Sequence, residues 1–479
     1  MITPRKSRPS ARPDSSATKA PNATATPRPF DWPLAREAER FLRRRISSFL
    51  SRNRFARQLA GRMRDETGTD FFEWVDHLVL PPGEQRALRA AGFVRDLHAE
   101  TPNGEPVYEC PRATLPRVLL RRGLPVAALR PEFVADFTAS HNLSGDPEGE
   151  PCSRYRRIVV ARENGTQLDA VERRSYRGFV PAPLKASQLS RIVKARELWR
   201  IRPRRFADDA KGFKAANRTL DRVLSLVGCD LACQFFFEAE RAYWQSRNRA
   251  ARIQKHRQDG LGLGWGNHDH HTFRSSREHF LDLVEFLLKL GFLKRERYYA
   301  GREAGWGAQV LEQPVTGIVV FADVDLLPEE TEVDFSTRRL SPARRLGTIG
   351  LWVGLHGESL LDAGMHHLEA RFDFDLLRDQ LKQAGVNTMK PFSDFPFLRQ
   401  AFTEGERWSV RPERARRLLA SGLISRLQSD QFIRQGALGS HLENLQRHGG
   451  FKGFNQKAVS IIITATDPRK THFGDAAAA

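Results

Sequence analysis

The stretch GNHDHHTFRSSREHFLDLVEFLLKLGF (residues 266–292) joins a histidine-rich polar segment directly to a strongly apolar one. HHTFRSS within it predicts a short strand. The residues after it predict a helix, because their apolar side chains share one stripe at helical spacing: Phe280, Leu283, Val284, Leu287 and Leu290. The segment therefore predicts a strand followed by a helix that packs on a sheet.

Three further strand-like segments follow this helix, KRERYYAG, GAQVLEQP and GIVVFADVDL, so the predicted order is β-α-β-β-β. A similar unit begins at His77, where FFEWVDHLVL (71–80) predicts a strand, GEQRALRAAGF a short helix and VYECPRATL another strand. A third strand and helix are predicted at GMHHLEARF (364–372) and DLLRDQLKQAGV. The units share too little sequence to form a repeat by identity, but their element order predicts an α+β fold.

The chain of 479 residues divides by composition into a tail, a domain and a second tail. We expect a disordered N-terminal tail at 1–29, a single catalytic domain at 30–460, and a C-terminal strand with a flexible tail at 461–479. Within the domain we expect a first β unit with N-terminal helices at 30–184, a helical insertion at 185–260, and a second β unit with the C-terminal part at 261–460.

The net charge of +20 and the pI near 10.3 would suit a polyanionic partner. Much of this charge lies in two arginine-rich runs, 40–64 and 191–205, which predict helix faces with solvated arginines, and no aromatic platform for nucleic acid accompanies them. No apolar run reaches the ~18 residues that span a bilayer. We expect a cytoplasmic protein that binds neither nucleic acid nor a membrane. A transit peptide in the tail and the oligomeric state are left open.

Two of the predicted units begin with the same dipeptide inside a strand, Asp76-His77 and Asp269-His270. A histidine at this position in each of two paired units could meet its counterpart across a cupped sheet, and a carboxylate from a later strand could complete a metal site. Two imidazoles and one carboxylate leave three positions open, which suits Fe(II) that binds a chelating substrate and O₂. Glu369 in HHLEARF is the best candidate carboxylate, and Glu312 in VLEQP is the rival.

Two other histidines of the opening stretch are not expected to bind metal. Alternation along a strand points His271 to the face opposite His270, and His268 is expected in the preceding loop.

Several motifs resemble the 2-oxoadipate dioxygenase/decarboxylase family. HHTFR (270–274) resembles that family's second-histidine motif HLTPR, and LEARF followed by DLLRDQL is similar to its carboxylate motif and the helix after it. GLISRLQSDQFIRQGALGSHLENL (422–445) is similar to the family's C-terminal run. The order of these motifs covers residues 70 to 447. The resemblance implies a vicinal-oxygen-chelate-like cupped β-sheet core of βαβββ units with a large helical insertion.

The resemblance also implies Fe(II) bound by His77, His270 and Glu369. Arg274 matches the arginine of the second motif and would hold an acidic group or brace the strand. The sequence departs from the family at Pro81, where an arginine is expected to grip the distal carboxylate of the substrate. Proline has no donor for a carboxylate, so we expect a changed substrate.

The leading hypothesis is an Fe(II)-dependent dioxygenase and decarboxylase that acts on a 2-oxo acid and O₂. By resemblance the substrate is 2-oxoadipate-like, and the products are CO₂ and a 2-hydroxy acid one carbon shorter. Two alternatives stay open at this point. One is a catalytically altered member, or a basic protein that binds an acidic partner, and the other is a zinc hydrolase on the same ligands.

Overall fold

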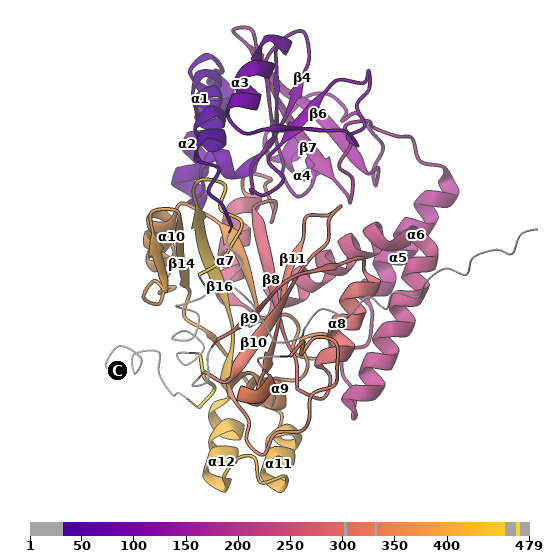
Figure 1. Ribbon diagram of the computed structural model, residues 1–479, viewed down its shortest axis with the longest axis vertical. Coiled ribbons are helices and arrows are strands. Elements are labelled where there is room, and N and C mark those ends of the chain that lie inside the picture. Colours follow the sequence, from indigo (N-terminus) through magenta and orange to yellow (C-terminus); the bar gives the residue numbers. More distant parts are fainter. Residues whose placement is uncertain (1–31, 301–303, 331–332, 456–465, 470–479) are drawn as a thin grey trace, which may run out of the picture.

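The computed structural model describes residues 32–300, 304–330, 333–455 and 466–469, and Figure 1 draws it with the first sheet above the second. The predicted tail at 1–29 lies outside the described residues, as does most of 461–479. The α-helices are α1 Arg36–Arg52, α2 Arg54–Arg62, α3 Gln85–Ala90, α4 Val134–Ser140, α5 Ala186–Arg200, α6 Asp209–Ser246, α7 Arg249–Asp259, α8 Phe280–Lys289, α9 Thr348–His356, α10 Phe374–Gln383, α11 Pro412–Ala420 and α12 Arg426–Gln435.

The strands form two sheets. The first sheet has the order β2-β3-β4-β1-β5-β7-β6, and the second has the order β13-β14-β16-β12-β8-β11-β10-β9, with β15 paired to β16. The strands of the first sheet are β1 Val75–Leu80, β2 Val94–Asp96, β3 Val107–Glu109, β4 Arg117–Leu120, β5 Val126–Leu129, β6 Tyr155–Glu163 and β7 Thr166–Arg173. Those of the second are β8 His268–Arg274, β9 Leu293–Tyr299, β10 Trp306–Glu312, β11 Val319–Asp325, β12 His367–Arg371, β13 Ser393–Phe395, β14 Leu398–Phe402, β15 Glu406–Trp408 and β16 Ala437–Arg447.

Each sheet consists of two similar units joined by their first strands. β1-α3-β2-β3-β4, β8-α8-β9-β10-β11 and β12-α10-β13-β14-β16 all have the first strand parallel to the last, and β5-α4-β6-β7 has the same arrangement with one strand fewer. β1 pairs antiparallel with β5, and β8 pairs antiparallel with β12. The topology confirms the predicted α+β class and the βαβββ units. The β5–β7 unit was not predicted.

The pairing register of the central strands is equivalent in the two sheets. In the first sheet His77 lies opposite Ala128, which lies opposite Asp169. In the second sheet His270 lies opposite Glu369, which lies opposite Glu443. The two Asp-His dipeptides therefore occupy equivalent positions in different sheets. His77 pairs with a residue of β5 and His270 with a residue of β12, so the two histidines are not partners of each other.

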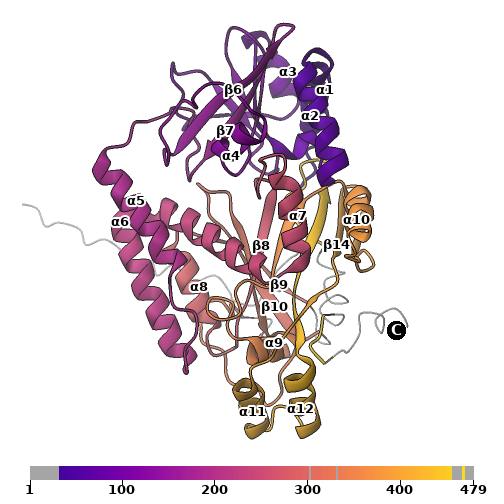
Figure 2. The same ribbon diagram turned by 180° about the vertical axis from the view of Figure 1, so that it is seen from behind.

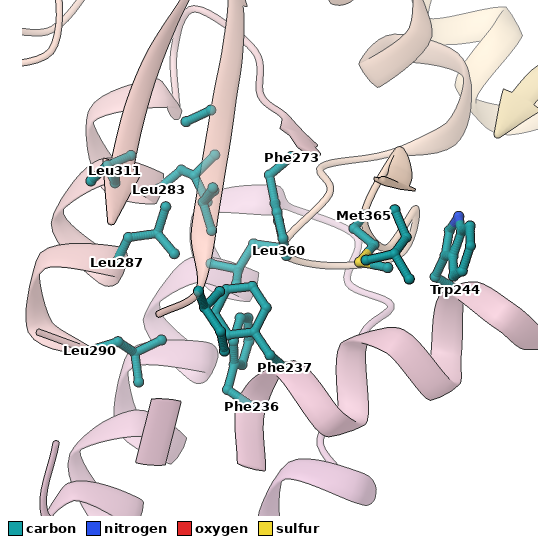
Figure 3. Close-up of a cluster of buried hydrophobic side chains, with 14 of the residues drawn as sticks. Phe236, Phe237, Trp244, Phe273, Leu283, Leu287, Leu290, Leu311, Leu360 and Met365 are labelled. Atoms are coloured by element: carbon teal, nitrogen blue, oxygen red, sulfur yellow. The ribbon is translucent and has the colours of Figure 1, made fainter. Parts of the chain in front are cut away.

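Helices cover one face of the second sheet. Phe236 and Phe237 of α6, Leu283 and Leu287 of α8, and Phe273 of β8 share one buried cluster (Figure 3). α5 and α6 run beside this sheet, and the view from behind shows α7 and α8 on the same side (Figure 2). Because side chains alternate along a strand, the neighbours of Phe273 point to the opposite, polar face.

Two local predictions need correction. The strand predicted at 71–80 begins only at Val75, because Phe71–Trp74 form a 3-10 turn whose side chains are all buried. His268, which we expected in a loop, is the first residue of β8. Among the described residues, no helix is long and apolar enough to cross a membrane.

Candidate metal centre

The structure brings together two of the three predicted ligands. His270 Nδ1 lies 2.9 Å from Glu369 Oε1, because the two residues are partners in the β8–β12 register. The contact is a close ionic one whose angle falls outside hydrogen-bond geometry. Both side chains are buried, and Glu369 is completely so.

The structure does not bring His77 to this pair. His77 Nδ1 lies 2.7 Å from Asp76 Oδ2, and Asp76 pairs with Arg173. The His77 ring packs against Phe179, also in the N-terminal part of the chain. Within the described ranges, no group of three or more closely spaced metal-ligating side chains includes His77. The reason is the internal duplication, since the strands β1 and β8 belong to separate sheets.

The rival carboxylate Glu312 lies at the end of β10, two strands from His270 in the sheet. Its two oxygens contact Lys452 Nζ at 2.7 Å and Arg295 Nη1 at 3.4 Å. Glu312 is therefore already paired with two cations.

Glu369 is also compensated by protein groups. Arg447 Nη2 lies 3.3 Å from Glu369 Oε1 and 3.0 Å from Asp269 Oδ1, and Gln400 Nε2 donates a 2.9 Å hydrogen bond to Glu369 Oε2. Burial alone would raise the pKa of Glu369, but His270 and Arg447 hold it below its usual value. This carboxylate is stable as an anion without a metal ion.

Glu443 on β16 has less compensation, a 3.1 Å hydrogen bond from Gln400 Nε2 to its Oε1. Its Oε2 faces His367 Nε2 at 3.0 Å and His270 Nε2 at 3.7 Å, and no arginine or lysine of the described chain forms an ion pair with it. Burial, followed by repulsion from Glu369, raises the pKa of Glu443 well above its usual value. A buried carboxylate in this position needs a proton or a bound cation.

Each of the two imidazoles that face Glu443 has a close polar neighbour at Nδ1. Glu369 lies against Nδ1 of His270, and Nδ1 of His366 lies 2.9 Å from Nδ1 of His367. Outer partners of this kind orient metal-binding histidines in proteins. Both Nε2 atoms face Glu443 Oε2, and His367 Nε2 also lies 2.9 Å from Thr272 Oγ1. Ligands at about 2.1 Å from a metal and at right angles are about 3.0 Å apart, so the 3.0 and 3.7 Å separations fit one divalent ion.

A third histidine, His441, stacks on His367 with ring centroids 4.9 Å apart. His366, His367 and His441 also form a group whose nitrogens could share a metal ion, and His441 Nε2 is buried without a hydrogen-bond partner. This group contains no carboxylate. It shares the His367 ring with the group His270, His367 and Glu443, so the two groups are alternative metal sites.

Arg274 lies in the same cavity as these groups. The cavity has a volume of ≈ 60 Å³ and is lined by Arg274, His270, His367 and Glu443 among others. This volume has room for about four water molecules. The Arg274 side chain is 1% exposed, its Nε and Nη1 have no hydrogen-bond partner, and burial lowers its pKa to about 10. Arg274 can therefore accept an anionic group in the cavity.

The remaining histidines of the opening stretch lie outside the centre. His271 points to the helical face, where its ring packs on Phe237 and its Nε2 lies 3.4 Å from Arg241. His268 Nδ1 lies 2.8 Å from the Trp265 carbonyl oxygen. Neither belongs to a group that could hold a metal in the described chain.

The sequence contains a signal for the two residues that we did not predict, His367 and Glu443. The tripeptide His-Leu-Glu occurs at 367–369 and again at 441–443. The two copies lie side by side in register on the parallel strands β12 and β16. In a strand, residues two apart share a face, so each copy places a histidine and a glutamate together on one side.

Comparisons with known proteins give weak likenesses. No family model and no curated protein matches the chain. A variant of 4-hydroxymandelate synthase from Streptomyces coelicolor is 13% identical over 81% of this chain and 97% of its own, with a TM-score of 0.26. Methylmalonyl-CoA epimerase from Mycobacterium tuberculosis is 14% identical over 38% and 88%, with a TM-score of 0.22. Protein YdcJ from Shigella flexneri, which includes domain DUF1338, is 11% identical over 55% and 74%, with a TM-score of 0.22.

These identities and TM-scores identify neither a family nor an activity. The class of the protein therefore follows from its own fold and site. It is an α+β protein of paired βαβββ units, with a buried group of histidines and glutamates that could bind a metal ion.

Proposed function

We propose that the protein is a non-haem iron(II) dioxygenase that acts on a 2-oxo acid and releases CO₂. The observation that supports this most directly is the convergence of His270 Nε2, His367 Nε2 and Glu443 Oε2 beside Arg274, whose Nε and Nη1 have no hydrogen-bond partner. Two imidazoles and one carboxylate on three adjacent strands match the ligand set used by such oxygenases. In this proposal His367 and Glu443 take the places that the sequence suggested for His77 and Glu369.

Each side chain then has a definite task. His270, His367 and Glu443 would hold iron, which would supply the template and the electrons for reaction with O₂. Glu369 and His366 position the two rings through Nδ1. Arg274 binds and orients the carboxylate of the substrate by charge-assisted hydrogen bonds. The burial of all these groups keeps bulk water out of the cavity.

The exact 2-oxo acid is part of the proposal. By the sequence resemblance it is 2-oxoadipate-like, and the product is a 2-hydroxy acid one carbon shorter. Pro81 follows β1 and is exposed, so it offers no donor to a distal carboxylate. We therefore expect weak turnover of 2-oxoadipate itself, compared with 2-oxo acids of other chain lengths and tails.

Metal analysis and oxygen uptake test the proposal. Protein purified without oxygen should bind one Fe(II) per chain and consume O₂ only with a 2-oxo acid, with CO₂ released in equal amount. Retention of zinc with O₂-independent turnover would instead indicate a hydrolase. Failure to bind any divalent metal, with salt-sensitive binding to polyanions, would instead indicate a binding protein.

The role of Arg274 has its own test. Arg274→Gln keeps a polar amide in place of the guanidinium but removes the charge, so KM for the 2-oxo acid should rise at least tenfold while the iron content is unchanged. The control is Arg414→Gln, which removes another buried guanidinium, one that pairs with Asp209 outside the cavity. An unchanged KM in Arg274→Gln would refute the carboxylate-binding role.

A further inference from the structure

A second and larger cavity lies where the two sheets meet. Its volume is ≈ 670 Å³, and its walls come from both sheets, with Asp76, Arg130 and Arg173 on one side and Asp269, His270 and Arg371 on the other. The lining includes eight arginines and lysines and six carboxylates, an excess of two positive charges. We call this cavity the inter-sheet cleft.

Most charged groups of the inter-sheet cleft are already paired. Asp76 contacts Arg173 at 2.8 Å, and Asp269 contacts Arg447 at 3.0 Å. In the outer part, Glu312 contacts Lys452 at 2.7 Å. These pairs leave the excess positive charge to other residues.

Arg130 and Arg371 are two of the weakly compensated cations of the cleft. Arg130 directly follows β5, and its side chain has no hydrogen-bond or ion-pair partner anywhere in the described ranges. Arg371 ends β12, and its Nε lies 3.8 Å from Glu73, which is beyond hydrogen-bond distance. Both side chains line the inter-sheet cleft, Arg130 from the first sheet and Arg371 from the second. Burial lowers the pKa of Arg130, and repulsion from Arg173 and Arg371 adds to this effect, against the attraction of Asp76.

We infer that the inter-sheet cleft binds the phosphoryl group of a small molecule through Arg130 and Arg371. Two guanidinium groups offer up to ten N–H donors from opposite walls of the cleft, and a carboxylate has only two oxygens to accept them. A phosphoryl group has three acceptor oxygens arranged around one atom and a charge near −2, which matches the excess in the cleft.

This site goes beyond the proposed function and uses none of the proposed metal ligands. His270 lines both the inter-sheet cleft and the small cavity of Arg274, so a molecule held at Arg130 and Arg371 lies next to the candidate metal centre. Binding can be measured on metal-free protein, and its failure would leave the iron proposal untouched.

The test is calorimetric titration of the full chain, stripped of metal with a chelator, at constant ionic strength. The probes are inorganic phosphate and the dicarboxylate glutarate. We expect saturable binding of phosphate at one site, with weaker binding of glutarate. Arg130→Gln and Arg371→Gln should each weaken phosphate binding at least tenfold, because each removes charge-assisted hydrogen bonds.

Arg177→Gln is the matched control, because Arg177 also lines the cleft but is 45% exposed and pairs with Glu109. It should change phosphate affinity less than twofold. Arg130→Lys keeps the charge and should retain part of the affinity, which separates loss of the site from loss of folding. Equal binding of glutarate and phosphate, wild-type affinity in Arg130→Gln, or an equal loss in Arg177→Gln would each overturn the inference.

Discussion

Replacing His367 by alanine tests the candidate metal centre most sharply. His367 and His441 are partners in the β12–β16 register, both are buried, and their rings stack. Only His367 directs a nitrogen at Glu443, at 3.0 Å. The two variants therefore remove the same side chain from neighbouring positions, and only one of them removes a proposed ligand.

The size of the effect follows from the number of ligands. The centre has three protein donors, and the two Nε2 atoms need to shift by less than about 1 Å to hold one ion at bond lengths near 2.1 Å. Loss of an outer partner alone costs about 10- to 100-fold in metal affinity. Loss of one of three direct ligands should cost at least about 100-fold, or about 2.7 kcal/mol.

The assay is anaerobic titration of metal-free protein with Fe(II), with metal content measured after gel filtration. His367→Ala should lose iron, whereas His441→Ala and His77→Ala should retain it within tenfold of the wild type. Circular dichroism checks that each variant is folded. Loss of iron in His441→Ala with Glu443→Gln unaffected would show that the three-histidine group holds the metal. Loss in His77→Ala would return that residue to the centre.

Three other predictions concern the same region and its counterpart in the first sheet. His270→Ala should abolish iron binding and O₂ uptake together. His271→Ala should retain both, because the His271 ring lies on the helical face of the sheet. Equal loss in the two folded variants would mean that the wrong histidine was assigned. Glu369→Gln should weaken iron binding about 10- to 100-fold, because it removes the anion that orients His270, and unchanged affinity would exclude that role. Burial raises the pKa of Asp169 from 3.8 to about 6, so its contribution to stability is present below about pH 3 and is lost as the pH rises through 6 to about 7. The free energy of unfolding of the wild type, relative to Asp169→Asn, should fall by about 3 kcal/mol over that range in urea titrations, and a flat difference would contradict the shift.

The fold was predictable where the hydrophobic pattern was strong. The stripe of α8 and the apolar strand β11 have clear periodicities, and both elements lie where the sequence suggested. The β5–β7 unit was not found, because β7 is buried at every position and carries Gln167, Asp169 and Glu172 among its apolar residues, so it shows no alternation. The burial of these polar residues depends on partners in other strands, which one sequence does not reveal.

The site was predictable only in part, for a physical reason. The repeated Asp-His dipeptide marks equivalent positions, but it does not say which strands pair, and β1 pairs with β5 while β8 pairs with β12. Glu369 was singled out as a ligand because it lies on a predicted strand, yet its pairing with Arg447 depends on a contact across 78 residues. The register of β12 with β16, which brings Glu443 to His367, is set by packing that a single sequence does not specify.

The first sheet repeats the framework of the second without the histidines and glutamates proposed to bind the metal. Ala128 stands where the second sheet has Glu369, and Val126 stands where it has His367. Selection can therefore act on the two halves separately. Changes in the wall that β1 and β5 give to the inter-sheet cleft can alter which molecules enter, while the proposed metal ligands of the second sheet stay fixed. A duplicated fold of this kind offers a route by which one chemistry acquires new substrates through mutations in the half that does not perform it.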